Sequence, residues 1–315
     1  MNFRKILEQL NLPFQCKKYG LPLWECPQFI FLIMGLIIIG STLLTYAIGT
    51  KYVEDPYTVA LVVIVITLIL LILAYIITRS FERLAEANRM KSEFVSIVSH
   101  QLRSPLSNLK WTLDLLLSER VDLDEKKELE YIKILEENTQ RMGNLISDLL
   151  IVSRIEQGRF APRIESISFN ELINKVIEET SVFSKATNAE ISFKSEESLP
   201  KIFCDPSQIK MVITNLLDNA IRYTRSRGKI EIRLFKKGKD LYFEIKDNGV
   251  GIPKEDYKYI FQKFFRSQNV LKEQTNGSGL GLYIAKSIID KAGGRAGFKS
   301  QEGIGSTFWF SLPLK

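Results

Sequence analysis

The sequence predicts three structural parts: two membrane-spanning helices, an all-α helical hairpin and an α+β domain. Two uncharged apolar stretches lie near the N-terminus, at residues 26–50 and 56–78. The following eighty residues repeat apolar side chains at the three-and-four spacing of amphipathic helices. Beyond residue 160, helix-like and strand-like segments are mixed, with glycines between them, which is typical of an α+β domain.

Composition limits the class of protein. The chain has 315 residues, enough for two modest domains, and 45% of them are hydrophobic. Their uneven distribution excludes both a fully soluble enzyme and a disordered chain. The formal net charge of +7 fits solvated helix faces and basic flanks beside a membrane, or acidic partners. Three cysteines, Cys16, Cys26 and Cys204, are too few for a disulfide framework, so we expect free thiols in a reducing compartment.

Each apolar stretch is long enough to cross a bilayer. Residues 29–48 and 58–77 are 20 residues each, which at about 1.5 Å per residue match a hydrocarbon core of about 30 Å. A pair of buried core helices is the alternative interpretation. We expect a cytoplasmic segment at 1–28 and an extracytoplasmic loop at 49–57, which is too short to fold a ligand-binding domain. A signal would therefore come from the membrane or from a neighbouring membrane protein.

Basic flanking residues predict the orientation. Arg4, Lys5, Lys17 and Lys18 precede the first span, and Arg79, Arg83, Arg89 and Lys91 follow the second. Only Lys51 lies between the spans. Because basic residues stay on the cytoplasmic side, both termini should be cytoplasmic in a multi-pass protein of the cell (inner) membrane.

A long helix with a single histidine should follow the second span, over residues 79–117. Its apolar stripe comprises Phe94, Val95, Val98, Leu102, Leu106, Leu109, Leu113 and Leu116. His100, the only histidine of the chain, falls on nearly the opposite face, beside Ser96, Arg103 and Ser107. Pro105 should bend the helix locally, because it removes the hydrogen bond to the Gln101 carbonyl. A solvated surface histidine is the plain alternative, but small hydroxyl neighbours leave this imidazole accessible.

A second amphipathic helix should pair with the first after a turn near 119–123. Asp124 can cap it, and Gly158 can end it. A lone hairpin cannot bury both apolar stripes, so two copies should form a four-helix bundle in a homodimer. We place this dimerising part at 78–160 and the α+β domain at 161–315.

The α+β domain lacks a P-loop but carries four ordered patterns. Helices are expected at 169–184 and from Asp205 to Tyr223, and strands at 190–194, 229–235, 241–246 and 307–312. Asn215 and Asn219 stand four residues apart on one helix face, where amide oxygens suit Mg²⁺ and Arg222 can reach phosphate. The segments Asp247–Pro253, Phe261–Arg266 and Gly277–Gly281 follow. Glycines at a helix start let backbone N–H groups approach phosphate oxygens.

These segments resemble a membrane sensor histidine kinase of two-component signalling, over roughly residues 90–313. His100–Leu106 resembles the H box of a HisKA-type phosphoacceptor domain. Asn215–Tyr223 resembles the N box, Asp247–Pro253 the G1 box, Phe261–Arg266 the F box and Gly277–Gly281 the G2 box. The resemblance implies a GHKL-type ATP-binding domain with the Bergerat α/β sandwich fold. It also implies ATP and Mg²⁺ as cofactors, a homodimer, and a response regulator receiver domain as partner, with no nucleic acid.

The resemblance also implies residue roles. His100 would be the phosphoacceptor, Asn219 the Mg²⁺ ligand supported by Asn215, and Asp247 the residue that reads adenine. The lid would lie between Phe265 and Gly279. The remaining nucleotide-site residues would be Arg222, Tyr223, Gly249, Gly251, Phe265, Arg266, Gly277, Gly279, Leu280, Gly281 and Thr307.

The chain departs from the family pattern beside the histidine. The family usually has Glu or Asp directly after it, where this chain has Gln101, and Thr or Asn at the position of Ser104. An amide can accept from the imidazole N–H but cannot take up its proton, so we expect a slower kinase. Serine keeps the hydroxyl used to orient water in dephosphorylating the regulator. The alternatives are a degenerate ATP-binding scaffold, a regulator that acts mainly as a phosphatase, and another GHKL ATPase of the gyrase or MutL type.

Overall fold

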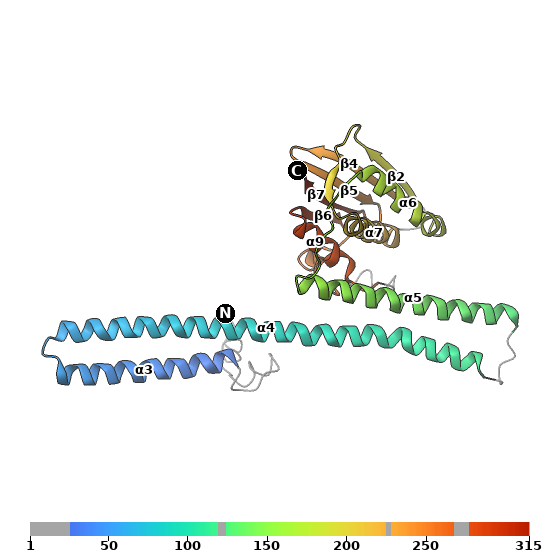
Figure 1. Cartoon of the computed structure of the whole chain (residues 1–315). Coiled ribbons are helices and arrows are strands. Elements are labelled where there is room, and N and C mark those ends of the chain that lie inside the picture. Colours follow the sequence, from blue (N-terminus) through green and yellow to red (C-terminus); the bar gives the residue numbers. More distant parts are fainter. Residues whose placement is uncertain (1–25, 119–123, 225–227, 268–276, 315) are drawn as a thin grey trace. The chain divides into compact units, whose positions relative to one another are not determined.

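The computed structural model describes residues 26–118, 124–224, 228–267 and 277–314. The chain divides into two compact units, Met1–Gln101 and Leu102–Lys315. Figure 1 labels the helices and strands of the chain. The predicted role of residues 1–28, the predicted turn at 119–123 and most of the predicted lid lie outside the described residues.

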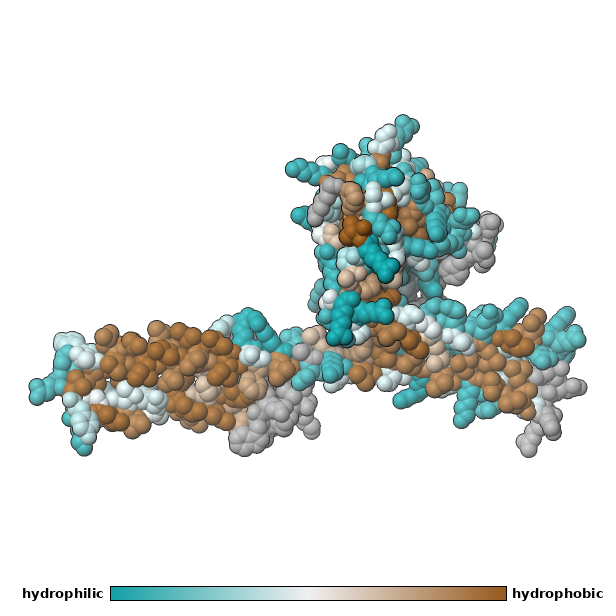
Figure 2. All heavy atoms as spheres, in the orientation of Figure 1, coloured by the Kyte–Doolittle hydropathy of each residue, from teal (hydrophilic) through white to brown (hydrophobic). Residues whose placement is uncertain are grey.

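The first unit contains two apolar helices, α3 (Pro27–Tyr52) and the first part of α4 (Pro56–Leu116). Both are long and apolar enough to cross a membrane, and only 6% of the apolar window of each is buried. Apolar residues cover the side of these helices seen in Figure 2. Only residues 53–55 separate the two helices, fewer than the nine expected. Asp55 begins α4 by accepting hydrogen bonds from the backbone N–H groups of Tyr57 and Thr58, both at 3.2 Å.

Helix α4 is a single element from the second apolar stretch to beyond His100. The sequence predicted a long helix over residues 79–117 directly after the second span. In the structure the two are one helix, and no glycine or proline interrupts residues 57–104. Pro105 lies inside the helix without terminating it.

Helix α5 (Glu125–Glu156) is the predicted second helix. The Asp124 side chain accepts a hydrogen bond from the Lys127 backbone N–H at 2.9 Å, as expected for an N-cap. Gly158 follows the helix with a φ of +68°, the left-handed conformation that ends helices. Leu145, Val152 and Ile155 are buried along one side of α5.

In its described residues, the C-terminal domain has a five-stranded mixed sheet and three α-helices. The sheet order is β2-β4-β5-β7-β6, formed by Glu190–Ser195, Lys229–Lys237, Asp240–Asp247, Gly305–Pro313 and Arg295–Gln301 in that order. Only the β2–β4 pair is parallel. A separate antiparallel pair joins β1 (Glu165–Ile167) to β3 (Ile202–Cys204). The helices are α6 (Phe169–Ala186), α7 (Pro206–Tyr223) and α9 (Gly281–Lys291), and η2 (Lys254–Asp256) is a short 3₁₀ turn.

The domain core lies between the sheet and its helices. Large apolar side chains line one face of the central strands, and each one buried there contributes about 1.5–3 kcal/mol. These buried side chains are Ile230, Ile232, Leu234, Leu241, Phe243, Ile245, Phe308, Phe310 and Leu312. Helices α7 and α9 complete the core with Ile209, Val212, Ile213, Leu217, Ile284, Ile288 and Ile289.

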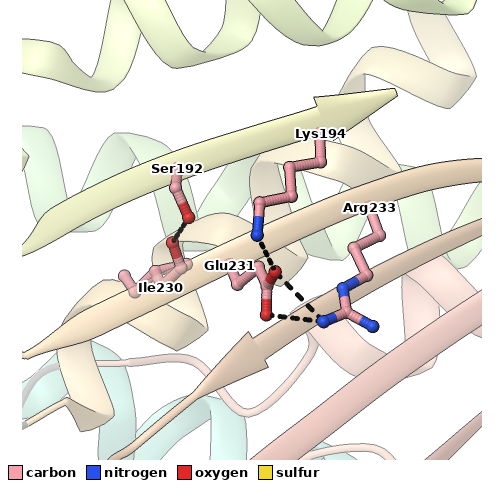
Figure 3. Close-up of polar contacts among 5 residues, drawn as sticks. All are labelled: Ser192, Lys194, Ile230, Glu231 and Arg233. Atoms are coloured by element: carbon pink, nitrogen blue, oxygen red, sulfur yellow. Dashed lines mark hydrogen bonds and ion pairs between the residues drawn. The ribbon is translucent and has the colours of Figure 1, made fainter. Parts of the chain in front are cut away.

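The opposite face of the sheet is polar, with a row of aromatic rings. Glu231 lies between Lys194 and Arg233, with N···O distances of 3.0 Å to each (Figure 3). Hydrogen bonds from Lys194 and Arg233 lower the pKa of Glu231. Tyr242 stacks between Phe235 and Trp309 at ring distances of 5.7 and 5.9 Å. Solvent screens these exposed ion pairs, so the buried face supplies most of the stability.

The elements expected from the sequence in this domain are present within a few residues. Strands β1, β3 and β6 were not predicted. Two of them are only three residues long, and β6 has a glycine and three charged or amide side chains in seven residues. These strands depend on their pairing partners rather than on a local pattern.

The expectation of free thiols is wrong for one cysteine. Cys26 is disulfide-bonded, although its partner is not among the described residues. Cys204, at the end of β3, is a buried free thiol. Burial raises the pKa of Cys204 to about 12, so this thiol is unreactive at neutral pH.

Candidate functional site

Asp247 organises one end of the C-terminal domain. It ends β5, and its Oδ1 accepts hydrogen bonds from the backbone N–H groups of Gly249 at 2.9 Å and Ser306 at 3.1 Å. Both of these hydrogen bonds go to Oδ1. The side chain is 5% exposed, and burial raises the pKa of its carboxyl group despite these hydrogen bonds. A buried acceptor held this firmly is suited to reading a hydrogen-bond donor.

Three glycines allow backbone segments to meet around Asp247. A β-carbon at Gly249 would collide with the Tyr223 carbonyl, and one at Gly305 with the Asp247 carbonyl. A β-carbon at Gly251, whose φ is +65°, would collide with the Gln301 carbonyl. The end of α7, the segment after β5 and the β6–β7 turn are therefore packed backbone against backbone.

Helix α7 brings the asparagine pair to the same region. The Asn215 Nδ2 donates to the Gly281 carbonyl at 3.3 Å, which ties α7 to the first residue of α9. Asn219 lies one turn further along, half-buried, and its side chain makes no hydrogen bond within the described residues. Its amide oxygen is thus available as a hard ligand.

The glycine turn before α9 is fixed by the phenylalanine segment. The Phe264 backbone N–H donates to the Gly279 carbonyl at 2.9 Å. A β-carbon at Gly279, whose φ is +71°, would lie 2.8 Å from the Phe264 backbone. Phe264 itself has a φ of +61°, uncommon for a residue with a side chain. This close backbone contact fixes the position of the start of α9 beside α7.

Helix α5 contacts this domain through a short docking face, which we define as Asp148, Ile155 and Glu156. Asp148 Oδ2 accepts from Ser278 Oγ at 2.8 Å, and the Ile155 carbonyl accepts from Lys291 Nζ at 3.0 Å. Glu156 forms an ion pair with Lys263. Each partner belongs to a different segment: the glycine turn, the end of α9 and the phenylalanine segment.

Positive charge gathers where α5, α7 and the phenylalanine segment meet. Burial lowers the pKa of the Arg141 guanidinium, and the positive charges of Arg266 and Arg222 lower it further. On α7, burial raises the pKa of Asp218, and Arg222 partly offsets this. Three guanidinium groups close enough to influence one another favour an anionic ligand.

His100 is exposed on α4, as the sequence predicted, and Ser96, Arg103 and Ser107 are exposed as well. Gln101 is half-buried and Ser104 is exposed one turn further along. The imidazole is therefore accessible to a second protein surface.

The structure brings together most of the predicted nucleotide-site residues. Asn215, Tyr223, Asp247, Gly249, Gly251, Gly279 and Gly281 are linked by the contacts above. Gly277 begins the described part of the glycine turn, and Leu280 occupies the N-cap position of α9. The ring of Phe265 lies 5.6 Å from that of Tyr259.

Thr307 does not join this group. It pairs with Lys246 on β5, on the sheet face opposite Asp247, and Ser306 supplies the contact to Asp247 instead. Sequence reasoning also missed Ser300, Arg141, Asp148 and Ser278. Ser300 Oγ accepts from the Ile252 backbone N–H at 2.9 Å. Gly303 and Gly305 were the sequence feature that could have pointed to the hydrogen bonds between Ser300 and Ser306.

Comparison with known proteins assigns this arrangement. Residues 204–315 match the family of histidine kinase-, DNA gyrase B- and HSP90-like ATPases, and residues 90–158 match the His kinase A (phospho-acceptor) domain. The chain belongs to the two-component sensor histidine kinases. Among curated relatives, this histidine kinase is 31% identical over 231 residues to the circadian input-output histidine kinase CikA of Synechococcus elongatus. That match covers 72% of this chain and 30% of the relative.

Solved histidine kinases share the fold. The structure of full-length ShkA in complex with AMPPNP matches 70% of this chain and 45% of that one, with a TM-score of 0.52 and 25% identity. The structure of ThkA in complex with the response regulator protein TrrA matches 73% and 64%, with a TM-score of 0.58 and 24% identity. The kinase spans only 25% to 38% of the length of the first five curated relatives.

Proposed function

We propose that this chain is a membrane-bound sensor kinase that phosphorylates His100 from Mg–ATP and passes the phosphoryl group to an aspartate of a response regulator. The observation that carries the proposal is the convergence of the N, G1, F and G2 segments around Asp247 and the start of α9. The accessible His100 on a separate helix supplies the acceptor that such an ATP site needs.

The residues present fit Mg–ATP. Asp247 Oδ2 would accept a hydrogen bond from the adenine amino group, and the glycines leave no side chain in the way of the nucleotide. The Asn219 amide oxygen would bind Mg²⁺, and Arg222 and Arg266 would face the phosphates. Bound Mg–ATP supplies the phosphoryl group. ShkA, which shares the fold, was solved in complex with AMPPNP, an ATP analogue, and this supports the assignment by similarity.

The chemistry at His100 depends on its protonation. The attacking nitrogen of the imidazole must be unprotonated, and the ring N–H must be held by an acceptor while the N–P bond forms and the bond to the leaving phosphate breaks. Gln101 can orient that N–H through its amide oxygen, but the proton must go to water. Ser104, one turn away, keeps the hydroxyl that would orient a water molecule when the regulator is dephosphorylated.

Exposed apolar surface on the hairpin supports a homodimer. Leu106, Trp111, Leu113 and Leu117 of the first helix and its end, and Leu129, Ile132, Ile146 and Leu150 of α5, are 47% to 74% exposed. A second hairpin would cover these side chains in a four-helix bundle. We place the dimerising part at 78–160, the ATP-binding domain at 161–315 and the membrane spans at 29–48 and 58–77.

Incorporation of labelled phosphate tests the proposal. The full chain in lipid nanodiscs, given Mg–ATP labelled on the γ-phosphate, should acquire acid-labile, alkali-stable label that passes to purified receiver domains. His100→Ala should remove the label without reducing ATP binding, and Asp247→Asn should remove both. Ser99→Ala is the matched control and should retain the label. Label that persists in His100→Ala would overturn the assignment of the acceptor.

A further inference from the structure

The docking face of α5 places a carboxylate at the start of α9. Asp148 and Ile155 are seven residues apart, which is about two helical turns, so both face the ATP-binding domain. Asp148 is the member of the face that contacts the glycine turn, through the 2.8 Å hydrogen bond from Ser278. Neither the fold nor the proposed reaction requires an acidic group at this position.

Ser278 links that carboxylate to the backbone of the helix start. Its Oγ donates to Asp148 and accepts from the Leu280 backbone N–H at 3.2 Å. The first N–H groups of a helix have no intrahelical partner and carry partial positive charge, which attracts anions. Here the serine hydroxyl satisfies one of these groups, and the Asp148 charge adds to the interaction.

Burial favours a neutral Asp148, and the hydrogen bond from Ser278 favours its charged form. Burial is the larger effect, so the pKa of Asp148 is raised. Asp148 is half-buried, held by one hydroxyl group, and faces the start of a helix. Its carboxylate can therefore take the place of a phosphate oxygen there.

We propose that Asp148 competes with the nucleotide phosphates for the glycine turn and the start of α9. In the docked arrangement, the Asp148 carboxylate of α5 is hydrogen-bonded to Ser278 in the glycine turn. Its negative charge disfavours the binding of a phosphate group at the same place. Phosphate binding releases the contact between Asp148 and Ser278 and so weakens the docking of the ATP-binding domain on α5. Because such coupling is reciprocal, docking lowers nucleotide affinity by the same factor. The proposal rests on the assignment of this domain as an ATP site.

Nucleotide affinity tests the competition. The full chain in nanodiscs is titrated with Mg–ATP by calorimetry, in the wild type and in Asp148→Asn, which keeps the shape and removes the charge. We expect Asp148→Asn to lower the Kd about 3- to 10-fold, as for the loss of one close like-charge interaction. Glu137→Gln removes the same charge from an exposed position of α5 and should leave the Kd unchanged.

Hydrogen exchange gives a second reading without nucleotide. In Asp148→Ala and Ser278→Ala, backbone amides of the first turn of α9 should exchange faster than in the wild type, while those of α6 should be unchanged. When Mg–ATP is added to the wild type, amide exchange in the first turn of α9 should no longer differ between the wild type and Asp148→Ala.

The outcomes separate this proposal from the one on which it rests. An unchanged or higher Kd in Asp148→Asn would overturn the competition, and so would unchanged exchange at α9. If Mg–ATP binds neither the wild type nor Asp148→Asn, the assignment of an ATP site fails. Tight Mg–ATP binding that Asp247→Asn removes and Asp148→Asn leaves unaltered would reject only the competition.

Discussion

Asp247 combines a functional position with an energetic cost. Burial raises the pKa of its carboxyl group, so the folded state binds this proton more tightly than the unfolded state. Asp247 therefore favours folding below its unfolded pKa and costs stability above its raised pKa, at neutral pH included. Such a cost is expected for a group retained for binding rather than for folding.

Asp247→Asn should separate the two effects. An Asn oxygen can still accept from Gly249 and Ser306, so the melting temperature without nucleotide should not fall, while affinity for Mg–ATP should fall at least about tenfold, because the adenine contact loses its carboxylate acceptor. Thermal unfolding and nucleotide titration measure both quantities. Asp240→Asn, at the other end of β5, should change neither. A large drop in melting temperature for Asp247→Asn would instead assign the residue a structural role.

Gln101→Glu tests the departure from the family pattern beside His100. A carboxylate can take up the imidazole proton that an amide cannot, and general-base groups accelerate proton transfer by about 100-fold or more. The initial rate of autophosphorylation should therefore rise, by about tenfold if proton removal only partly limits the rate. Asn108→Asp adds the same charge two turns further along α4 and should leave the rate unchanged. An equal or lower rate in Gln101→Glu would contradict the prediction.

From the sequence, candidate site residues could be proposed only where they carry a local pattern. Asn215 and Asn219 stand at helical spacing, and Asp247 precedes a glycine run, so both features could be found without a structure. Asp148 and Ser278 are 130 residues apart, and no spacing rule connects them. Ser306 was passed over for its neighbour Thr307, because Ser306 contacts Asp247 through its backbone N–H, which no side-chain pattern reveals.

At the scale of secondary structure, glycines in the left-handed region differ in what surrounds them. Gly251 and Gly238 have φ values of +65° and +64°. A β-carbon at Gly251 would collide with the Gln301 backbone, whereas the space at Gly238 is open. The two positions thus share backbone strain and differ in steric crowding.

Alanine substitution should measure that difference. Gly238→Ala should cost about 1–2 kcal/mol of unfolding free energy, the penalty of the left-handed conformation. Gly251→Ala should cost clearly more, because the β6–β7 turn must also move, and should weaken Mg–ATP binding. Denaturant unfolding of both variants makes the comparison. Equal costs would mean that the turn moves freely and is not part of a fixed site.

Elements with strong periodicity were predictable, and those that depend on partners were not. Helices α6 and α7 have clear apolar faces, and the Asp205–Pro206 pair marks the start of α7. Strand β6 owes its existence to β7, which pairs with it from Gly305 to Ser311. Local propensity in β6 is too weak to overcome its glycine and its polar residues without that pairing.

At the scale of the whole molecule, the sequence indicated the order of the parts, but not where the apolar part of α4 gives way to its amphipathic part. Residues 79–117 carry a helical pattern, and so does the preceding apolar stretch. An apolar helix has no periodic signal that would mark its junction with an amphipathic one. That the two form a single 61-residue helix became evident only from the backbone.

Membrane orientation is testable at the short connection between α3 and α4. Glu54 is exposed there, so in a chain with Cys16, Cys26 and Cys204 replaced by Ser, Glu54→Cys should react with a membrane-impermeant maleimide on intact cells. Lys126→Cys, at the exposed start of α5, should react only after permeabilisation. Labelling of Lys126→Cys on intact cells would contradict the predicted orientation and exclude phosphotransfer to a cytoplasmic regulator.

Because α4 is unbroken, the direction of the His100 imidazole around the helix axis depends on the number of residues between it and the apolar stretch. Each residue of a helix turns the chain by about 100°, so one residue inserted between Arg79 and Lys91 would rotate His100 by about that angle relative to the apolar stretch. A seven-residue insertion would return it to within about 20° of its original heading, only about 10 Å further away. After the apolar stretch, rotation of α4 about its own axis therefore changes the direction of every side chain along it. Torsion along it, rather than its length, would determine which way the phosphoacceptor points.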